Sequence, residues 1–317
     1  MEENPSANPS VDPEKLRERC TEEKMKHVLE VKTEIKKILG NHLRNNGFKE
    51  ISPVIISPET DPLYHATGKA EFEYYGKKFQ LTKSMILHKQ ISLLTHDKIF
   101  VFSPNVRLEP VELADTGKHL VEFTQLDLEV SGARREDLLE LGEELLVHVI
   151  KSVKENCQEQ LAFFDRELKI PETPFERIKY HHAYSEYGRI FEEVLSQQKE
   201  DPFWLIDIPA EQREFYDKEY PERPGILKDM DLIYPEGFGE ALSGGERESE
   251  KDRIVQRMEE HELDPEDFEY YLKMVDEGIP DSGGFGMGIE RLTRFICGLE
   301  EIVDTRLFPK PPGSAPL

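Results

Sequence analysis

The sequence is poor in cysteine and has no long apolar run. Its three cysteines, Cys20, Cys157 and Cys297, lie far apart without CxxC or histidine companions, which argues against a disulfide framework or a zinc site. No stretch reaches the roughly 18 apolar residues of a transmembrane helix. The N-terminus lacks the basic and apolar regions of a signal peptide. We therefore expect a cytoplasmic protein with a disordered leader over residues 1–14 and one domain over residues 15–317.

Basic residues are also in the minority. The chain has 41 Lys and Arg against 65 Asp and Glu, which gives a net charge of −24. The basic residues are interspersed with acids and form no separate patch. Such a surface repels nucleic-acid phosphates, so tRNA is not an expected partner. Solubility, or adaptation to a salty cytoplasm, would equally account for the acidity.

The apolar periodicity predicts several regular elements. Helices with the three- and four-residue spacing of amphipathic segments are expected over residues 13–46, 135–156 and 180–198. Short strands are expected over residues 48–58, which Pro53 interrupts, and over residues 201–209. Residues 78–94 have the pattern of a strand that enters a helix, with Ser84 at the cap position.

The stretch from residue 102 to residue 129 alternates like an antiparallel hairpin. Its strands are VRLE and VEFTQLDLEV, joined by a polar loop. Because side chains alternate along a strand, one face of the second strand carries Phe123, Gln125, Asp127 and Glu129. A row of acids and amides is costly to bury without partners. From this stretch alone, a solvated sheet face and a ligand-binding face are equally good interpretations.

Two later segments are rich in glycine. In residues 230–258, Asp231 begins an apolar strand, and Glu240 and Ser243 precede a turn at Gly244-Gly245. A carboxylate and a nearby hydroxyl suit a hard cation such as Mg²⁺, although this segment is equally consistent with a plain loop before a helix.

Residues 282–299 place four glycines ahead of a helix. GFGMG resembles a relaxed dinucleotide fingerprint, but no βαβ unit or ribose-binding acid follows it, so that interpretation fails. Glycines at this position let the backbone approach a flat ligand closely and expose the helix N-terminus to anions. Arg291, on the first turn, would then contact a phosphate or stack on a base.

Three stretches together carry a family resemblance. VRLE with KHLVEFTQLDLE resembles motif 2 of the class II aminoacyl-tRNA synthetases, GFGMGIERL resembles motif 3, and the first long helix with FKEISPVIISP resembles motif 1. LTKSMILHKQ, DLIYPEGFGEALSGGER and LFPKPPG are similar to the aspartyl and asparaginyl subgroup. The resemblance runs from about residue 25 to the C-terminus. It implies an α+β catalytic domain with an antiparallel sheet flanked by helices, and a homodimer.

The subgroup's synthetases carry an anticodon-binding barrel ahead of motif 1, and only a leader and a helix are expected here. The sequence therefore most resembles the free-standing archaeal asparagine synthetases, which are related to aspartyl-tRNA synthetase. LTKSMILHKQ, DPFWLIDIP, EFYDKE and SGGERE carry this closer likeness. The resemblance implies ATP and Mg²⁺ as cofactors, with aspartate and ammonia as substrates.

The resemblance also assigns roles to individual residues. It implies that ATP is bound by Arg107, Glu109, His119, Phe123, Glu240 and Arg291, and Mg²⁺ by Glu240 and Ser243, with Asp231 a possible further ligand. Arg107, Asp127 and Arg291 are the expected catalytic residues, because they would stabilise charge at phosphorus or handle the ammonium group.

The amino-acid side of the site shows one departure from the family pattern. Lys89 and Arg247 match the pair that grips the distal carboxylate of aspartate, whereas the pattern alone would make Lys89 a solvated helix lysine. Where the family has a glutamine that contacts the substrate ammonium, this chain has Ile86. We expect the ammonium to be held instead by three side chains, those of Ser84, Gln125 and Asp127.

The sequence thus favours an AMP-forming asparagine synthetase that converts aspartate to β-aspartyl-adenylate and then to asparagine with free ammonia. One alternative is a ligase that makes the same adenylate for another acceptor, such as tRNA, a protein amine or a small metabolite. The other alternative is a non-catalytic relative of the synthetases that senses aspartate.

Overall fold

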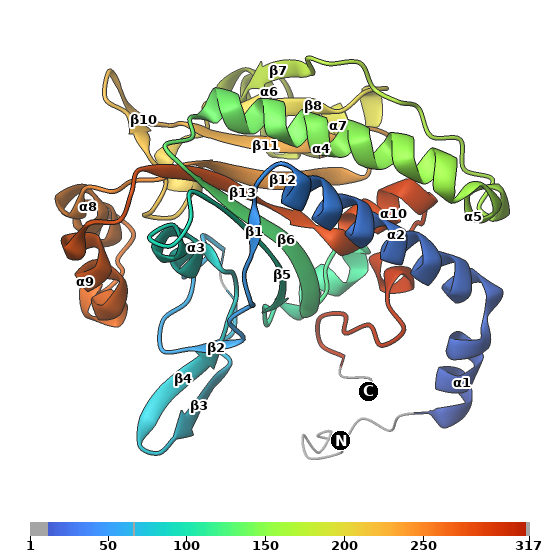
Figure 1. The fold of residues 1–317 in the computed structure, drawn as a ribbon, viewed down its shortest axis with the longest axis horizontal. Coiled ribbons are helices and arrows are strands. Elements are labelled where there is room, and N and C mark those ends of the chain that lie inside the picture. The colour runs from blue at the N-terminus through green and yellow to red at the C-terminus, as the bar shows by residue number, and fades with distance from the viewer. Residues whose placement is uncertain (1–11, 66, 315–317) are drawn as a thin grey trace.

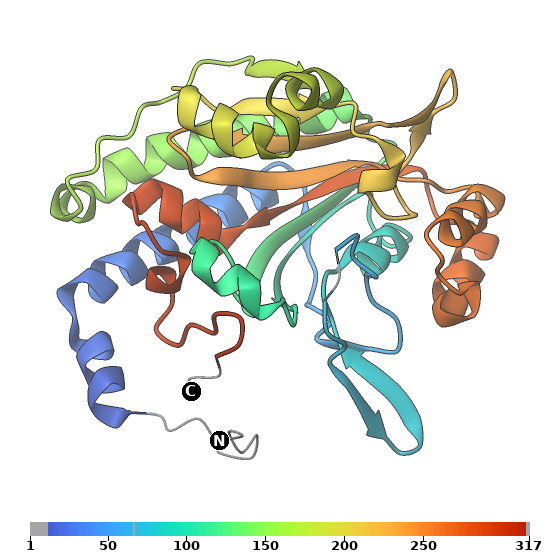
Figure 2. The ribbon, with the colours of Figure 1, turned by 180° about the vertical axis from the view of Figure 1, so that it is seen from behind.

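A mixed eight-stranded sheet forms the centre of the computed structural model, which describes residues 12–65 and 67–314 (Figures 1 and 2). Across the sheet, the strands are β1 (Lys49–Glu50), β5 (Lys98–Val106), β6 (Glu122–Ser131), β13 (Ser282–Gly288), β12 (Gly239–Glu246), β11 (Asp229–Tyr234), β8 (Phe203–Ile206) and β7 (Glu176–Lys179). The middle six pair antiparallel, and only the edge strands β1 and β7 pair parallel to their neighbours. The expected antiparallel sheet flanked by helices is confirmed.

Three helices cover one face of this sheet and bury the main core. They are α2 (Glu23–Asn45), α4 (Arg135–Asn156) and α10 (Ile289–Cys297). Their apolar stripes pack against the inward side chains of the central strands, among them Leu126 and Leu128 of β6 and Phe285 and Met287 of β13. Burial of these side chains supplies the main driving force for folding. The opposite face of β6 and β13 is therefore left for polar side chains.

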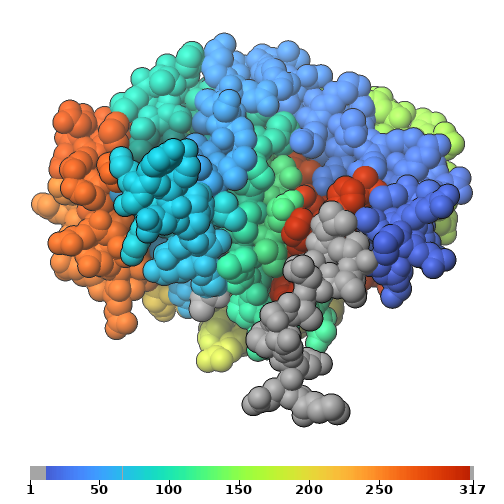
Figure 3. All heavy atoms as spheres, turned by 90° about the horizontal axis from the view of Figure 1, so that it is seen from below, coloured from blue at the N-terminus to red at the C-terminus, as the bar shows by residue number. Residues whose placement is uncertain are grey.

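Smaller units surround the sheet. Helices α6 (Tyr180–Tyr187) and α7 (Phe191–Gln198) pack near β8 and β11, and a second apolar cluster joins α3 (Ile86–Ser92) to α8 (Lys251–Glu260) and α9 (Glu269–Gly278). A three-stranded sheet of β2 (Ile56–Ser57), β4 (Lys77–Leu81) and β3 (Glu71–Tyr74) projects from the body, towards the viewer in Figure 3. The remaining elements are α1 (Pro13–Thr21), α5 (Gln158–Phe163), β9 (Glu219–Tyr220) and β10 (Arg223–Leu227).

Several boundaries differ from those expected. The helix over residues 13–46 is two helices, because Glu22 has an extended backbone between α1 and α2. Asp12 caps α1, so residues 13 and 14 of the expected leader are helical, and residues 1–11 lie outside the described part. The helix over residues 180–198 is broken at Gly188 (φ 63°). Among the described helices, none has the length and apolarity needed to cross a lipid bilayer.

The expected hairpin is present with shifted strands. The first strand, β5, lies upstream of VRLE and pairs with β6 from Lys98 opposite Val130 to Val106 opposite Glu122. Arg107 and Glu109 follow its end, where the Arg107 amide still donates to the Val121 carbonyl at 2.8 Å. Arg107 and Glu109 therefore extend over the face of the sheet that carries the polar row of β6. The alternation had predicted that polar row for the second strand of the hairpin.

The glycine-rich segments are strands. Gly244 and Gly245 lie within β12, which contradicts the expected turn, and the glycines of residues 283–288 form β13. The reason is close packing between strands. A Cβ atom on Gly284 would lie 2.2 Å from the Leu128 carbonyl oxygen and 2.2 Å from Oε2 of Glu129. The missing side chains leave room for the acids of β6.

This close packing predicts opposite effects for two glycine substitutions. Gly284→Ala should lower the free energy of unfolding by about 3 kcal/mol, because the new methyl group meets fixed backbone. In contrast, Gly40→Ala should raise it by up to about 1 kcal/mol, because Gly40 lies within α2 and its Cβ would meet only the flexible end of Arg44. Urea unfolding of both variants measures the difference. Equal effects would show that the interstrand packing is not a constraint.

Candidate active site

The polar face of β6 borders a cavity of about 370 Å³. Phe123, Gln125 and Asp127 line it, whereas Leu126 and Leu128 point into the core, which confirms the alternation predicted for this strand. The cavity brings together the site residues that the family resemblance implied, with the exception of Asp231: Ser84, Lys89, Arg107, Glu109, His119, Phe123, Gln125, Asp127, Glu240, Ser243, Arg247 and Arg291. These come from segments as distant as α3 and α10.

One end of the cavity joins an arginine to an aromatic ring. The Arg107 guanidinium lies over Phe123, 5.1 Å from the ring centroid, and its Nε donates to the Lys83 carbonyl. Glu109 is paired with His65 at 3.1 Å. Burial would raise the pKa of Glu109, but the hydrogen bond and charge of His65, with the charge of Arg107, outweigh it and lower the pKa. Glu109 is thus held as an anion that accepts hydrogen bonds.

His119 lies close to Arg291 at the outer side of this end. Its Nδ1 is 2.7 Å from the Thr116 hydroxyl, in the loop between β5 and β6. Burial and the positive charge of Arg291 lower the pKa of His119. At neutral pH the ring is therefore a neutral hydrogen-bonding group, and Arg291 supplies the positive charge.

A carboxylate and a hydroxyl of β12 border the same side. Glu240 Oε1 accepts from Arg291 Nη1 at 2.9 Å, and Ser243 lies opposite Asp231 in the β11–β12 pairing. Both oxygens of Asp231 lie 2.6 Å from Arg213 Nη2, and Asp231 itself does not line the cavity. No group of three or more His, Cys, Asp or Glu suited to hold a metal occurs among the described residues. Glu240 and Ser243 would hold Mg²⁺ only together with ligand oxygens.

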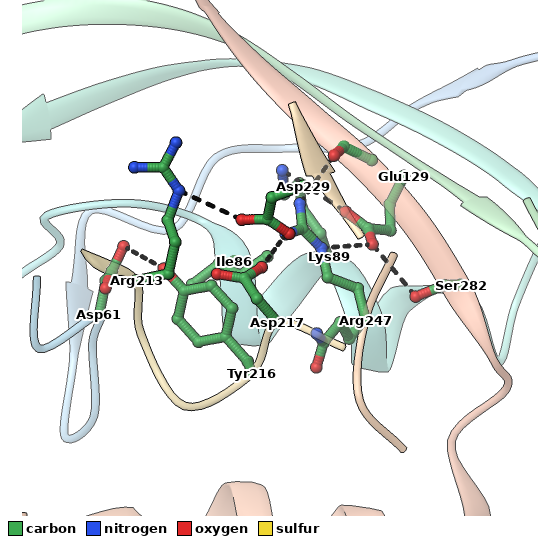
Figure 4. Close-up of polar contacts among 12 residues, drawn as sticks. Asp61, Ile86, Lys89, Glu129, Arg213, Tyr216, Asp217, Asp229, Arg247 and Ser282 are labelled. Atoms are coloured by element: carbon green, nitrogen blue, oxygen red, sulfur yellow. Dashed lines mark hydrogen bonds and ion pairs between the residues drawn. The ribbon is translucent and has the colours of Figure 1, made fainter. Parts of the chain in front are cut away.

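A buried ionic cluster closes the inner end of the cavity (Figure 4). Lys89, only 2% exposed, lies 3.1 Å from Asp127 Oδ1 and 3.5 Å from Glu129 Oε2. Arg247 pairs with Glu129 at 3.1 Å and with Asp217 at 2.7 Å. Three acids thus surround two cations. Lys89 is therefore buried, whereas the pattern alone predicted a solvated helix lysine.

A second set of acids beside this cluster was not found from the sequence. Asp61 accepts hydrogen bonds from the Ser84 hydroxyl at 2.7 Å and from Tyr216 at 3.1 Å. Glu214 accepts from the Tyr64 amide at 2.7 Å. Asp61 and Glu214 lie in loops without periodicity. Only the segment EFYDKE, already noted for its family likeness, could have pointed to Glu214, Tyr216 and Asp217.

The contacts of Ser84 at the start of α3 and of the Gln125 side chain differ in detail from those predicted. Met85, not Ser84, occupies the N-cap position of α3, although the Ser84 hydroxyl still accepts from the Ile86 amide at 3.3 Å. Ile86 itself is 4% exposed and lines the cavity with an apolar surface. Gln125 has its carbonyl oxygen occupied by Asn105, which donates at 2.6 Å. Within the described part of the chain, the Gln125 amide nitrogen and Asp127 Oδ2 form no hydrogen bond.

Glu290 ties the cavity to two outer segments. Its buried carboxylate accepts from the Thr124 amide of β6 at 2.8 Å and from Lys32 of α2 at 2.7 Å. Arg306, near the C-terminus, lies 3.2 Å from the same carboxylate. The backbone carbonyl of Lys310 accepts from Val121 at 2.7 Å, just ahead of β6. The strand under the cavity is thus held from both α2 and the C-terminal segment.

A mainly antiparallel sheet with this cavity over its polar face, flanked by helices, is the class II aminoacyl-tRNA synthetase catalytic fold. More specifically, residues 14–312 match the family model for tRNA synthetases class II (D, K and N). The chain belongs to that family.

Solved structures of asparaginyl-tRNA synthetases are similar to this chain. The Pyrococcus horikoshii enzyme, complexed with asparaginyl-adenylate, is 27% identical with a TM-score of 0.88, over 97% of this chain and 74% of that one. The Entamoeba histolytica enzyme, also in complex with asparaginyl-adenylate, is 25% identical with a TM-score of 0.86, over 98% and 73%. A putative aspartyl-tRNA synthetase from Leishmania major Friedlin, 19% identical with a TM-score of 0.77 over 92% and 66%, shows the shared fold.

The charge of Glu192, on α7, predicts a pH-dependent stability. Burial, with the negative charges of Glu240 and Asp231, raises the pKa of Glu192 from 4.5 to about 7. Between pH 4.5 and 7, Glu192 therefore holds a proton in the folded state that it has lost in the unfolded chain. The stability that this proton contributes falls as the pH rises from 4.5 through 7. Glu192→Gln should raise the melting temperature at pH 8 by about 2 °C or more, and the gain should vanish at pH 5.

Thermal unfolding at the two pH values, without nucleotide or Mg²⁺, measures this effect. Glu193→Gln is the matched control, because the neighbouring Glu193 is exposed on the same helix. A stabilisation of the Glu192 variant that is as large at pH 5 as at pH 8 would contradict the assignment.

Proposed function

We propose that this protein is an AMP-forming asparagine synthetase that uses aspartate, ATP and ammonia. The observation that carries the proposal is the pairing of two buried cations, Lys89 and Arg247, at the inner end of a cavity whose outer end holds Arg107 and Arg291. A dicarboxylate that spans the cavity would have one carboxylate at the inner cations and the other beside Arg107. Asparagine has only one carboxylate, so it could place a carboxylate at only one of the two cationic ends.

ATP would bind at the outer end. Phe123 offers a ring face for adenine, and Glu109, held as an anion, accepts from an amino group. Arg107 would contact the α-phosphate and the reacting carboxylate together, and would stabilise the charge that develops on phosphorus. His119 and Arg291 would take the outer phosphates. Positioning and electrostatics account for most of this chemistry, since no protein nucleophile is required.

Mg²⁺, when bound, would neutralise phosphate charge during adenylate formation. Glu240 and Ser243 line the cavity beside Arg291 and fit this role, together with phosphate oxygens. Asp231 is paired with Arg213 and supports the pairing of β11 with β12 from outside the cavity. Glu192 adds a further negative charge next to Glu240, and such repulsion between carboxylates is relieved by a cation.

The choice of the β-carboxylate is supported by the groups around Ile86. If aspartate is turned end for end between the two cationic grips, its ammonium group moves by one carbon. The apolar Ile86 offers it no acceptor, whereas Asp127 Oδ2 is buried, lines the cavity and has no partner among the described residues. Asp127, with Gln125 and Ser84, would then hold the substrate ammonium.

A second candidate is aminoacylation of tRNA, which proceeds through an adenylate on the α-carboxylate. It is favoured by the likeness to two asparaginyl-tRNA synthetases that were solved in complex with asparaginyl-adenylate. The acidity of the chain favours the first candidate, because an acidic surface repels polyanions such as tRNA. Lys89 also favours it, because its charge matches a carboxylate of aspartate.

The two candidates make different products. Enzyme, Mg-ATP and aspartate should release pyrophosphate, and asparagine and AMP should accumulate only when ammonium is added, because ammonia is the acceptor. Trapping the adenylate with hydroxylamine should give the β-hydroxamate of aspartate. Chromatography against authentic standards distinguishes the β- from the α-hydroxamate, since the two have the same mass.

Each other outcome contradicts a part of the proposal. Asparagine activated in place of aspartate, or aspartate transferred to tRNA but not to ammonium, would support the tRNA-charging candidate. An α-hydroxamate would refute the reversed orientation at Ile86. ADP as product would contradict adenylate chemistry altogether.

A further inference from the structure

The inner end of the cavity holds more acids than its cations can neutralise. Six carboxylates, those of Asp61, Asp127, Glu129, Glu214, Asp217 and Asp229, surround three cations that form ion pairs there, Lys89, Arg213 and Arg247, while the charges of Lys83 and Arg257 act on Asp61 and Asp217 without an ion pair. Arg213 is shared further with Asp231. A buried surplus of negative charge is costly unless protons or cations compensate it. One substrate ammonium group offsets only part of this surplus.

The excess is localised on one wall, which we call the acidic wall: Asp61, Glu214, Asp217 and Asp229 (Figure 4 labels all but Glu214). Asp217 is committed to Arg247, and Asp229 to Arg213. Among the described residues, neither Asp61 nor Glu214 forms an ion pair. The charges of Lys83 and Arg213 act on these two carboxylates only from a distance, without an ion pair.

Asp229 provides an independent sign that this wall is built for a ligand. It is 1% exposed and lines the cavity, yet its Oδ1 accepts no hydrogen bond within the described part of the chain. Gly245 leaves the space for that oxygen, because a Cβ there would lie 2.2 Å from it. An unpartnered buried oxygen costs free energy unless a donor reaches it when a ligand binds.

We propose that the acidic wall binds the ammonium ion that supplies the amide nitrogen, with Glu214 as the base that deprotonates it. A small cation with four N–H donors matches several converging carboxylate oxygens. This site is separate from Asp127, which would hold the ammonium group of aspartate itself. The inference rests on the proposed function, since it requires ammonia as the acceptor.

The chemistry balances without a further reactant. Ammonium transfers one proton to the Glu214 carboxylate and becomes ammonia. The nitrogen lone pair forms a bond to the β-carbonyl carbon of the adenylate, and the bond from that carbon to the phosphate oxygen breaks, so that AMP leaves with the electron pair. The nitrogen then releases a second proton to water, which leaves asparagine.

The surroundings of Glu214 suit proton transfer. Burial, with the negative charges of Asp61 and Asp217, raises the pKa of Glu214 to about 7, against the charge of Arg213 and the hydrogen bond from the Tyr64 amide. A base with a pKa near the working pH both takes up and releases a proton readily. Binding of ammonium itself would lower that value, because a cation favours the carboxylate.

Glu214→Gln tests the proposal. The variant should need at least about tenfold more ammonium for half-maximal asparagine formation, because a charge-assisted hydrogen bond is lost. Hydroxylamine is neutral at pH 7 and needs no such base, so hydroxamate formation should stay within about threefold of wild type. Glu211→Gln is the matched control, since Glu211 is exposed three residues away and outside the cavity. Glu214→Asp should recover part of the ammonium affinity.

The outcomes separate the two levels of inference. Wild-type asparagine synthesis with an unchanged ammonium requirement in Glu214→Gln would overturn the ammonium site alone. An equal loss with ammonium and with hydroxylamine would also overturn it, because Glu214 would then act in adenylation or folding. If wild type forms the adenylate but never uses ammonium, the proposed function fails and the site with it.

Discussion

The structure depends on the mutual neutralisation of buried charges where α3, β6 and the end of β12 meet. Lys89 and Arg247 are almost fully buried, and each has two carboxylates within 3.5 Å. Removing either cation would leave buried acids without a partner, which is among the most destabilising changes a protein can undergo. These ion pairs therefore fix the positions of α3, β6 and the end of β12 relative to one another, which the apolar core alone would not do.

The apolar core and the ionic cluster share the same strands. Alternate residues of β6 belong to each, so the core face determines the register and the register determines which acids meet the cations. Glycines of β12 and β13 complete this arrangement, because they allow strands and carboxylates to approach closely where any side chain would clash. Stability and the chemistry of the cavity thus have one structural origin.

Period-two alternation was sufficient to predict the polar row Phe123, Gln125 and Asp127, because it is a local property of one strand. The family likeness added Lys89 and Arg247, which pattern alone assigned to solvent or a loop. Asp61, Glu214 and Asp229 were not predicted, since their proximity arises from two loops and the start of β11, which meet only in three dimensions. The glycine strands were misjudged for a related reason. Glycine disfavours strands locally, and here the tertiary packing overrides that preference.

The fastening of β6 by the C-terminal segment has a consequence for the whole chain. Arg306 and Lys310, which lie far from β6 in sequence, hold the start of the strand that carries Phe123 by hydrogen bonds. The adenine end of the cavity can take its final shape only after residues 306–310 have been made. A polypeptide still emerging from the ribosome would hold the inner ionic cluster before it held a complete nucleotide site.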